Sequence, residues 1–121
     1  MRLLLDTHIL LWVITNDSKL PKSIRAAIIN ADNVFVSMAS LWECAVKISI
    51  KKLSMDFEKI LKAIDASGFE MLSIKPEHLS ELLDLPMHHK DPFDRLLIAQ
   101  ALSEPLILQS VDPLVLAYFE A

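Results

Sequence analysis

The chain has 121 residues, 53% of them hydrophobic, and it contains a single glycine. This composition excludes a disordered or linker-rich protein, and the length suits one compact domain over residues 1–121. The formal net charge of −4 excludes nucleic-acid binding through a broad basic surface, because counterion release requires clustered lysine and arginine. A phosphate-containing substrate must therefore meet positive charge concentrated at one place.

Short apolar runs alternate with longer helical patterns along the chain, an order typical of α/β folds. Continuous apolar runs predict buried strands at residues 3–5, 34–36 and 106–108. A weaker strand is predicted at residues 69–73, after Gly68 ends a helix. Helical patterns cover six further segments, near residues 7–15, 21–30, 38–52, 56–66, 76–84 and 92–103. We therefore predict an α/β fold with a parallel sheet buried by helices on both faces.

The sequence also predicts where the protein is found. No apolar run approaches the ~20 residues of a membrane-spanning helix, and Asp6 interrupts the first run too early for a secretory segment. The single cysteine, Cys44, excludes an internal disulfide and a thiolate metal cage, which fits a reducing compartment. We expect a cytoplasmic protein that makes no contact with membranes.

Acidic residues stand at the margins of buried elements, directly after an apolar run or on an apolar helix. Four carboxylates have such a position: Asp6, Glu43, Asp94 and Asp112. Ionised carboxylates are costly to bring near a core unless a cation compensates their charge. Ligands of parallel sheets bind beyond the carboxyl ends of the strands, so we expect the loops there to meet in one crevice. Two hydroxyl residues follow the same strand ends, Ser37 and Ser110.

Some of these acids also have a purely structural interpretation. Asp91 and Asp112 each precede a proline, as helix N-caps often do. For Asp91 we favour the cap, with Arg95 as its helical partner four residues on. Capping and a site function are equally supported for Asp112, and Asp6 has a capping role open to it at the helix that follows.

The two acids on helices differ in the partners available to them. Glu43 precedes Lys47 by four residues, so a solvated ion pair is an alternative to a site function. Asp94 lies along an apolar stripe with Leu97 and Ile98, where no cation is present to pair with it. A site function is therefore favoured most clearly for Asp94.

Three strings of residues carry a resemblance to a known family. They are DTHILLW at residues 6–12, SLWE at residues 40–43 and DPFDRLLIAQA at residues 91–101. Together they closely resemble the PIN-domain ribonucleases and, among these, the VapC-like toxins of toxin–antitoxin pairs. The resemblance covers nearly the whole chain. It implies a three-layer α/β/α domain with a central, mainly parallel sheet of four to five short strands.

The resemblance also implies an acidic pocket that holds Mg²⁺ or Mn²⁺ and hydrolyses phosphodiester bonds in RNA. The catalytic acids of the family match Asp6, Glu43, Asp94 and, more loosely placed, Asp112. The metal ligands match the first three of these, and supporting hydroxyl residues match Thr7, Ser37 and Ser110. The partners that the resemblance implies are an RNA substrate, an antitoxin protein and a second copy of the chain in a homodimer.

The residue types suit this chemistry. Mg²⁺ prefers hard oxygen ligands and retains several waters, so two or three carboxylates anchor it and leave positions for the substrate. Lys47 and Arg95 are candidate contacts to RNA, while a solvated helix face and a pair with Asp91 are equally good explanations of them. Three histidines lack the spacing of a zinc site: His8, His88 and His89.

Two functions from different classes follow. The first is a metal-dependent endoribonuclease of toxin type. The alternative is a catalytically inactive PIN-fold module, whose acids bind a basic partner segment rather than a metal. The chain departs from the family pattern at Lys51, which takes the place of a glycine after the Glu43 helix.

Overall fold

The computed structural model describes residues 1–120, and Ala121, the last residue of the predicted domain, lies outside them. The strands are β1 (Arg2–Leu5), β2 (Asn33–Ser37), β3 (Glu70–Leu72) and β4 (Ile107–Gln109). The helices are α1 (Thr7–Ile14), α2 (Lys22–Asn30), α3 (Met38–Ser49), α4 (Phe57–Ala66), α5 (Pro76–Leu83), α6 (Pro92–Ser103) and α7 (Pro113–Leu116), followed by the 3₁₀ helix η1 (Ala117–Phe119).

The four strands of the described residues form one parallel sheet in the order β3-β2-β1-β4. The chain first builds outward from β1 to β3 and then returns to place β4 on the other side of β1. This reversal puts a topological switch point beside β1, where the crossovers on either side diverge and leave a crevice. The predicted α/β fold is confirmed, and the sheet has four strands.

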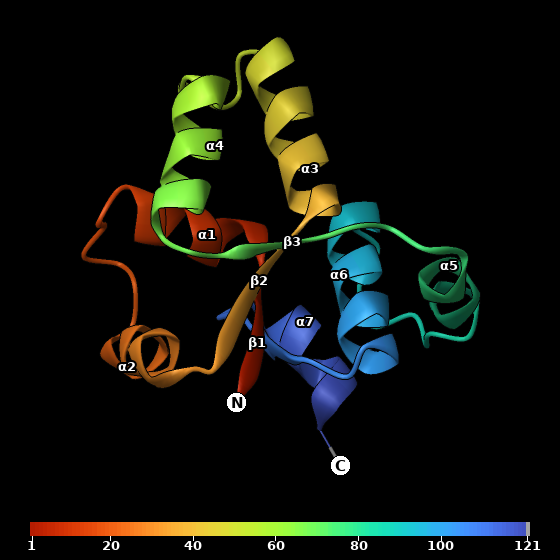
Figure 1. The fold of residues 1–121 in the computed structure, drawn as a ribbon. Coiled ribbons are helices and arrows are strands. Elements are labelled where there is room, and N and C mark those ends of the chain that lie inside the picture. The colour runs from red at the N-terminus through yellow and green to blue at the C-terminus, as the bar shows by residue number, and fades with distance from the viewer. Residues whose placement is uncertain (121) are drawn as a thin grey trace.

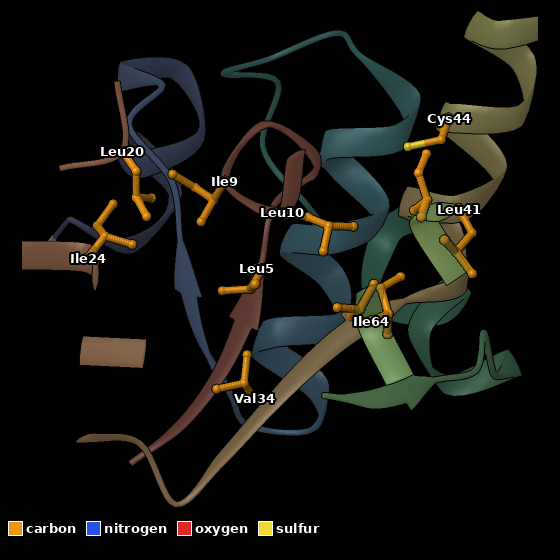
Figure 2. Close-up of a cluster of buried hydrophobic side chains, with 11 residues drawn as sticks. Leu5, Ile9, Leu10, Leu20, Ile24, Val34, Leu41, Cys44 and Ile64 are labelled. Carbon is orange, nitrogen blue, oxygen red and sulfur yellow. The ribbon is translucent and has the colours of Figure 1, made fainter. Parts of the chain in front are cut away.

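Helices cover both faces of the sheet, as Figure 1 shows. Leu4 and Leu5, successive residues of β1, belong to separate hydrophobic clusters, because side chains alternate between the two faces of a strand. One cluster joins Leu5 to side chains of α1, α2, α3 and α4, and Figure 2 shows its members, including Leu41 and Cys44 of α3. The other joins Leu4 to α6 and α7. The continuous apolar runs therefore form strands buried on both sides.

The α3 helix ends three residues earlier than predicted, at Ser49. Lys51 adopts the left-handed conformation, with φ of 62°, and the amides of Lys52 and Leu53 donate to the carbonyl of Lys47. A left-handed residue of this kind ends a helix and is most often glycine. Lys51, which replaces the glycine of the family pattern, therefore keeps the backbone conformation that glycine favours.

A buried polar network links α5 and α6 to the end of β2. The Ser37 hydroxyl donates to Oε1 of Gln100, and Gln100 in turn contacts Nδ1 of His78, which is fully buried. The amide of Lys75 also donates to this Nδ1 at 3.0 Å, so Nδ1 carries a lone pair and Nε2 carries the proton. Nε2–H then donates to Glu104. The network places the amino end of α3 against α6.

Replacing Glu104 by glutamine is expected to make stability less dependent on acid pH. The hydrogen bond from His78 lowers the pKa of Glu104 below its ordinary value near 4.5. The folded state is therefore favoured above that value, and this advantage disappears as the pH falls through the lowered pKa. The free energy of unfolding of the wild type and of Glu104→Gln, measured from pH 7 to pH 3, tests this prediction, and Glu77→Gln on the exposed surface is the control. If the stability of the wild type and of Glu104→Gln changed with pH in parallel, the prediction would be contradicted.

Within residues 1–120, no helix has the length and apolar character needed to cross a bilayer.

Candidate metal site at the carboxyl ends of the strands

Asp6 lies directly after β1 and opens α1. Its Oδ1 accepts a hydrogen bond of 2.8 Å from the amide of Ile9, so the capping role is confirmed. The side chain is buried, at 5% exposure. Burial raises the pKa of Asp6, against the opposing hydrogen bonds from Ser110 and Ile9. Asp6 is therefore a buried carboxylate whose ionised form gains from a nearby cation.

Glu43 lies on α3 and is only 3% exposed. Its Oε2 pairs with Nζ of Lys47 at 2.7 Å, so the predicted ion pair is present, but the carboxylate is buried rather than solvated. Its Oε1 is the one buried side-chain oxygen or nitrogen within residues 1–120 that has no hydrogen-bond partner. A buried carboxylate oxygen without a partner costs free energy unless a cation or donor reaches it.

Asp94 lies in the first turn of α6, beside the beginning of α3 (Figure 1). Burial raises the pKa of Asp94, and the charges of Asp91 and Glu43 raise it further, while the hydrogen bond from His89 lowers it. The apolar stripe of α6 offers Asp94 no cation, as predicted, but Nε2 of His89 lies 2.8 Å from its Oδ2. The partner comes from the loop before the helix, which a helical spacing rule does not consider.

Asp112 caps α7, since its Oδ1 accepts from the amide of Leu114 at 2.9 Å. Its Oδ2 lies 3.7 Å from Nε2 of His89, and its side chain is 40% exposed. The hydroxyl of Ser110 accepts from the amide of Asp112 at 3.1 Å. Asp112 is therefore the most exposed of the four predicted acids, and its position depends on a short helix.

The predicted acids lie in two connected groups, Asp6 and Asp94 each near Glu43, and Asp94 near Asp112 through His89. The charge of Glu43 raises the pKa of both Asp6 and Asp94, so Glu43 lies within electrostatic range of each of these two carboxylates. One ligand atom from each of His89, Asp94 and Asp112 lies within 4.8 Å of the others. Sequence reasoning missed His89, although it stands two residues before the DPFDRLLIAQA string.

The predicted supporting hydroxyl residues join the elements that carry these acids. The Thr7 hydroxyl donates to that of Ser40 at 3.0 Å, which ties α1 to α3. Ser37 caps α3 by accepting from the amide of Ala39 and donates to Gln100 of α6. Ser110 contacts both Asp6 and Asp112, as described above. These hydroxyls therefore hold the helices and loops of the acids in place.

The predicted pair between Arg95 and Asp91 is absent, whereas the cap at Asp91 is confirmed. Oδ1 of Asp91 accepts from the amide of Asp94 at 2.9 Å. The Arg95 guanidinium instead donates to the carbonyls of Pro86 and His89 and, at 2.9 Å, to the Tyr118 hydroxyl. Arg95 is thus occupied in holding the loop before α6.

A cavity of about 180 Å³ lies between α1 and α3. Its walls come from α1 and from α3 with the segment that follows it, through Thr7, His8, Leu11, Cys44, Lys47, Lys52 and Leu53. Burial raises the pKa of Cys44 to about 11, so this thiol is protonated at neutral pH and is no nucleophile. The two lysines give the cavity a positive side, and one of them, Lys47, pairs with Glu43.

The donor set fits a hard divalent cation. Carboxylate oxygens are the ligands that Mg²⁺ and Mn²⁺ prefer, and three of them come from buried or partly buried side chains of Asp6, Glu43 and Asp94. The unpartnered Oε1 of Glu43 is the clearest structural sign of this fit, because a bound cation would compensate its burial.

Comparison with known proteins agrees with the fold. The family model of the PIN domain matches residues 3–113, and the chain belongs to this family. Among solved structures, the chain is similar in fold to a chain in the crystal structure of VapBC2 from Rickettsia felis. That structure contains VapBC2 bound to a DNA fragment from its promoter. The TM-score is 0.66, with 16% identity over 93% of this chain and 89% of that chain. No curated protein gives a significant match.

Proposed function

We propose that the protein is a metal-dependent endoribonuclease, the VapC-like toxin of a toxin–antitoxin pair. The observation that supports this most directly is the buried Oε1 of Glu43, which lacks a partner while the Glu43 charge acts on both Asp6 and Asp94. Membership of the PIN domain family and similarity in fold to a chain of VapBC2 support the same proposal. We assign the catalytic role to Asp6, Glu43, Asp94 and Asp112.

Each group of residues has a distinct part in the proposed reaction. Asp6, Glu43 and Asp94 bind Mg²⁺ or Mn²⁺, and Asp112 completes the acidic pocket. When bound, the divalent ion supplies Lewis acidity and a water of lowered pKa for phosphodiester hydrolysis. Lys47 holds Glu43 in position and, with 38% of its side chain exposed, offers a charge to the RNA backbone.

The proposed partners are an antitoxin protein and a second copy of the chain, and the proposed location is the cytoplasm. Met38 and Trp42, one helical turn apart on α3, are 45% and 56% exposed. The Trp42 ring meets Phe93 of α6 edge to face at 4.9 Å between centroids. An exposed apolar surface next to the acidic pocket is suited to burial against another protein.

Removal of divalent ions is expected to abolish RNA cleavage. Purified protein, freed of metal with a chelator, should leave a single-stranded RNA intact and should cut it after addition of Mg²⁺ or Mn²⁺. The same incubation with Ca²⁺ separates catalysis from simple charge neutralisation, since Ca²⁺ prefers longer ligand distances and more ligands. Cleavage that continues unchanged in excess chelator would contradict the proposal.

A second candidate function is a catalytically inactive module that binds a basic partner segment. The ion pair of Lys47 with Glu43 favours this function, because a basic side chain already pairs with one of the two oxygens of the Glu43 carboxylate. Isothermal calorimetry distinguishes the two functions. The nuclease binds Mn²⁺ at the pocket, whereas the inactive module binds a lysine- and arginine-rich peptide and no divalent ion.

A further inference from the structure

We propose that His89 is a nitrogen ligand of the divalent ion and gives this pocket a preference for Mn²⁺ over Mg²⁺. This inference rests on the proposed function, because it concerns the composition of the same metal site. It adds a ligand of a different chemical kind from the four acids. An imidazole suits transition metals better than Mg²⁺, which prefers oxygen.

Nε2 of His89 is hydrogen-bonded to Asp94, and the distances around it also fit ligand atoms of one ion. In octahedral coordination at about 2.1 Å, neighbouring ligand atoms lie about 3 Å apart and opposite ones about 4.2 Å apart. Nε2 of His89 lies 2.8 Å from Oδ2 of Asp94 and 3.7 Å from Oδ2 of Asp112. The three ligand atoms lie within 4.8 Å of one another. Little movement is therefore needed to bring them around one ion.

The backbone of His89 is fixed from two sides. The Tyr118 hydroxyl accepts from the amides of His88 and His89, at 3.0 and 2.9 Å. Arg95 donates to the His89 carbonyl at 3.3 Å and to the same tyrosine. The His89 side chain is only 15% exposed. A ligand held in this way loses little conformational entropy when it binds a metal.

A second observation indicates that positive charge is needed close to Asp94. Oε1 of Glu43 is buried without a partner, and the Glu43 charge acts directly on Asp94, which is the residue that His89 contacts. Within residues 1–120, the polar contacts of the His89 ring all involve Nε2. Nε2–H of His89 donates to Asp94 in this structure, and in the tautomer with its proton on Nδ1 a neutral imidazole presents the Nε2 lone pair to an ion held by Asp94 and Asp112 instead.

Pulsed electron paramagnetic resonance of bound Mn²⁺ tests this proposal without relying on activity. The wild-type protein with one equivalent of Mn²⁺ should give electron spin-echo modulation from a directly bound ¹⁴N nucleus. His89→Gln should remove this modulation while retaining Mn²⁺, because glutamine supplies an oxygen of similar reach. His88→Gln is the matched control, since the His88 ring meets Tyr118 edge to face and its replacement should leave the modulation unchanged. Circular dichroism establishes that each variant is folded, and His89→Asn is a second replacement.

Calorimetry supplies an independent measurement. Mn²⁺ affinity should fall roughly tenfold or more in His89→Gln, with Mg²⁺ affinity changed much less, so the preference for Mn²⁺ decreases. Wild-type Mn²⁺ spectra without ¹⁴N modulation overturn the proposal, as does modulation that persists in His89→Gln and disappears in His8→Gln. If RNA is still cleaved in those cases, only the role of His89 fails. Absence of both Mn²⁺ binding and cleavage rejects the proposed function itself.

Discussion

Replacing Asp6 and Asp94 together by asparagine is expected to reduce Mg²⁺-dependent RNA cleavage by about a thousandfold. Asparagine has nearly the same shape as aspartate but carries no charge, so the pocket loses two of its anionic oxygen donors. The fold should survive, because asparagine is an equally good N-cap and keeps the hydrogen bond from Ile9 to residue 6. Initial rates of cleavage of a labelled RNA measure the effect.

Asp91→Asn is the matched control for this double variant. It makes the same chemical change three residues before Asp94, at a position whose Oδ1 caps α6. Since asparagine retains the cap, cleavage should stay within a few-fold of the wild-type rate. Equal cleavage by the wild type and the double variant would reject the assignment of the acidic pocket. A large loss in Asp91→Asn would instead extend the pocket to that residue.

Glu43→Gln is expected to change activity and stability in opposite directions. Cleavage should fall at least ~100-fold, because the pocket loses a buried anionic ligand. In metal-free buffer, however, the free energy of unfolding should increase by about 1 kcal/mol. The carboxylate is 3% exposed, its Oε1 lacks a partner, and its charge repels those of Asp6 and Asp94. Lys47, the partner of Oε2, is exposed enough for water to replace the ion pair.

Urea unfolding in the presence of a chelator measures the change in stability, and RNA cleavage with Mn²⁺ measures the change in activity. Glu58→Gln removes the same charge from an exposed site on α4 and should change neither quantity strongly. A Glu43→Gln protein that is less stable than the wild type without metal would show that the ion pair with Lys47 outweighs the cost of burial. The free-energy cost of burying the Glu43 carboxylate would then no longer support a metal ion in the pocket.

Local signals in the sequence determined most of the secondary structure. The helix at residues 92–103 has the predicted bounds, because Asp91 caps it and Pro92 occupies its first position. The strands lie within a residue or two of the apolar runs, since burial on both faces leaves little choice of residue type. The end of α3 differs from the prediction because Lys51 adopts a conformation that its residue type does not signal.

The sequence by itself also identified the acids, through their unusual positions beside apolar runs and through the family strings. Only the tertiary structure decided their partners. Arg95 reaches Tyr118, 23 residues away, rather than Asp91 on the same helix, and His89 contacts both Asp94 and the distant Asp112. Helical spacing rules consider only neighbours on one element, whereas these contacts arise where a loop, α6 and the chain after β4 meet. The unpartnered oxygen of Glu43 likewise depends on burial by several elements together, which no local pattern records.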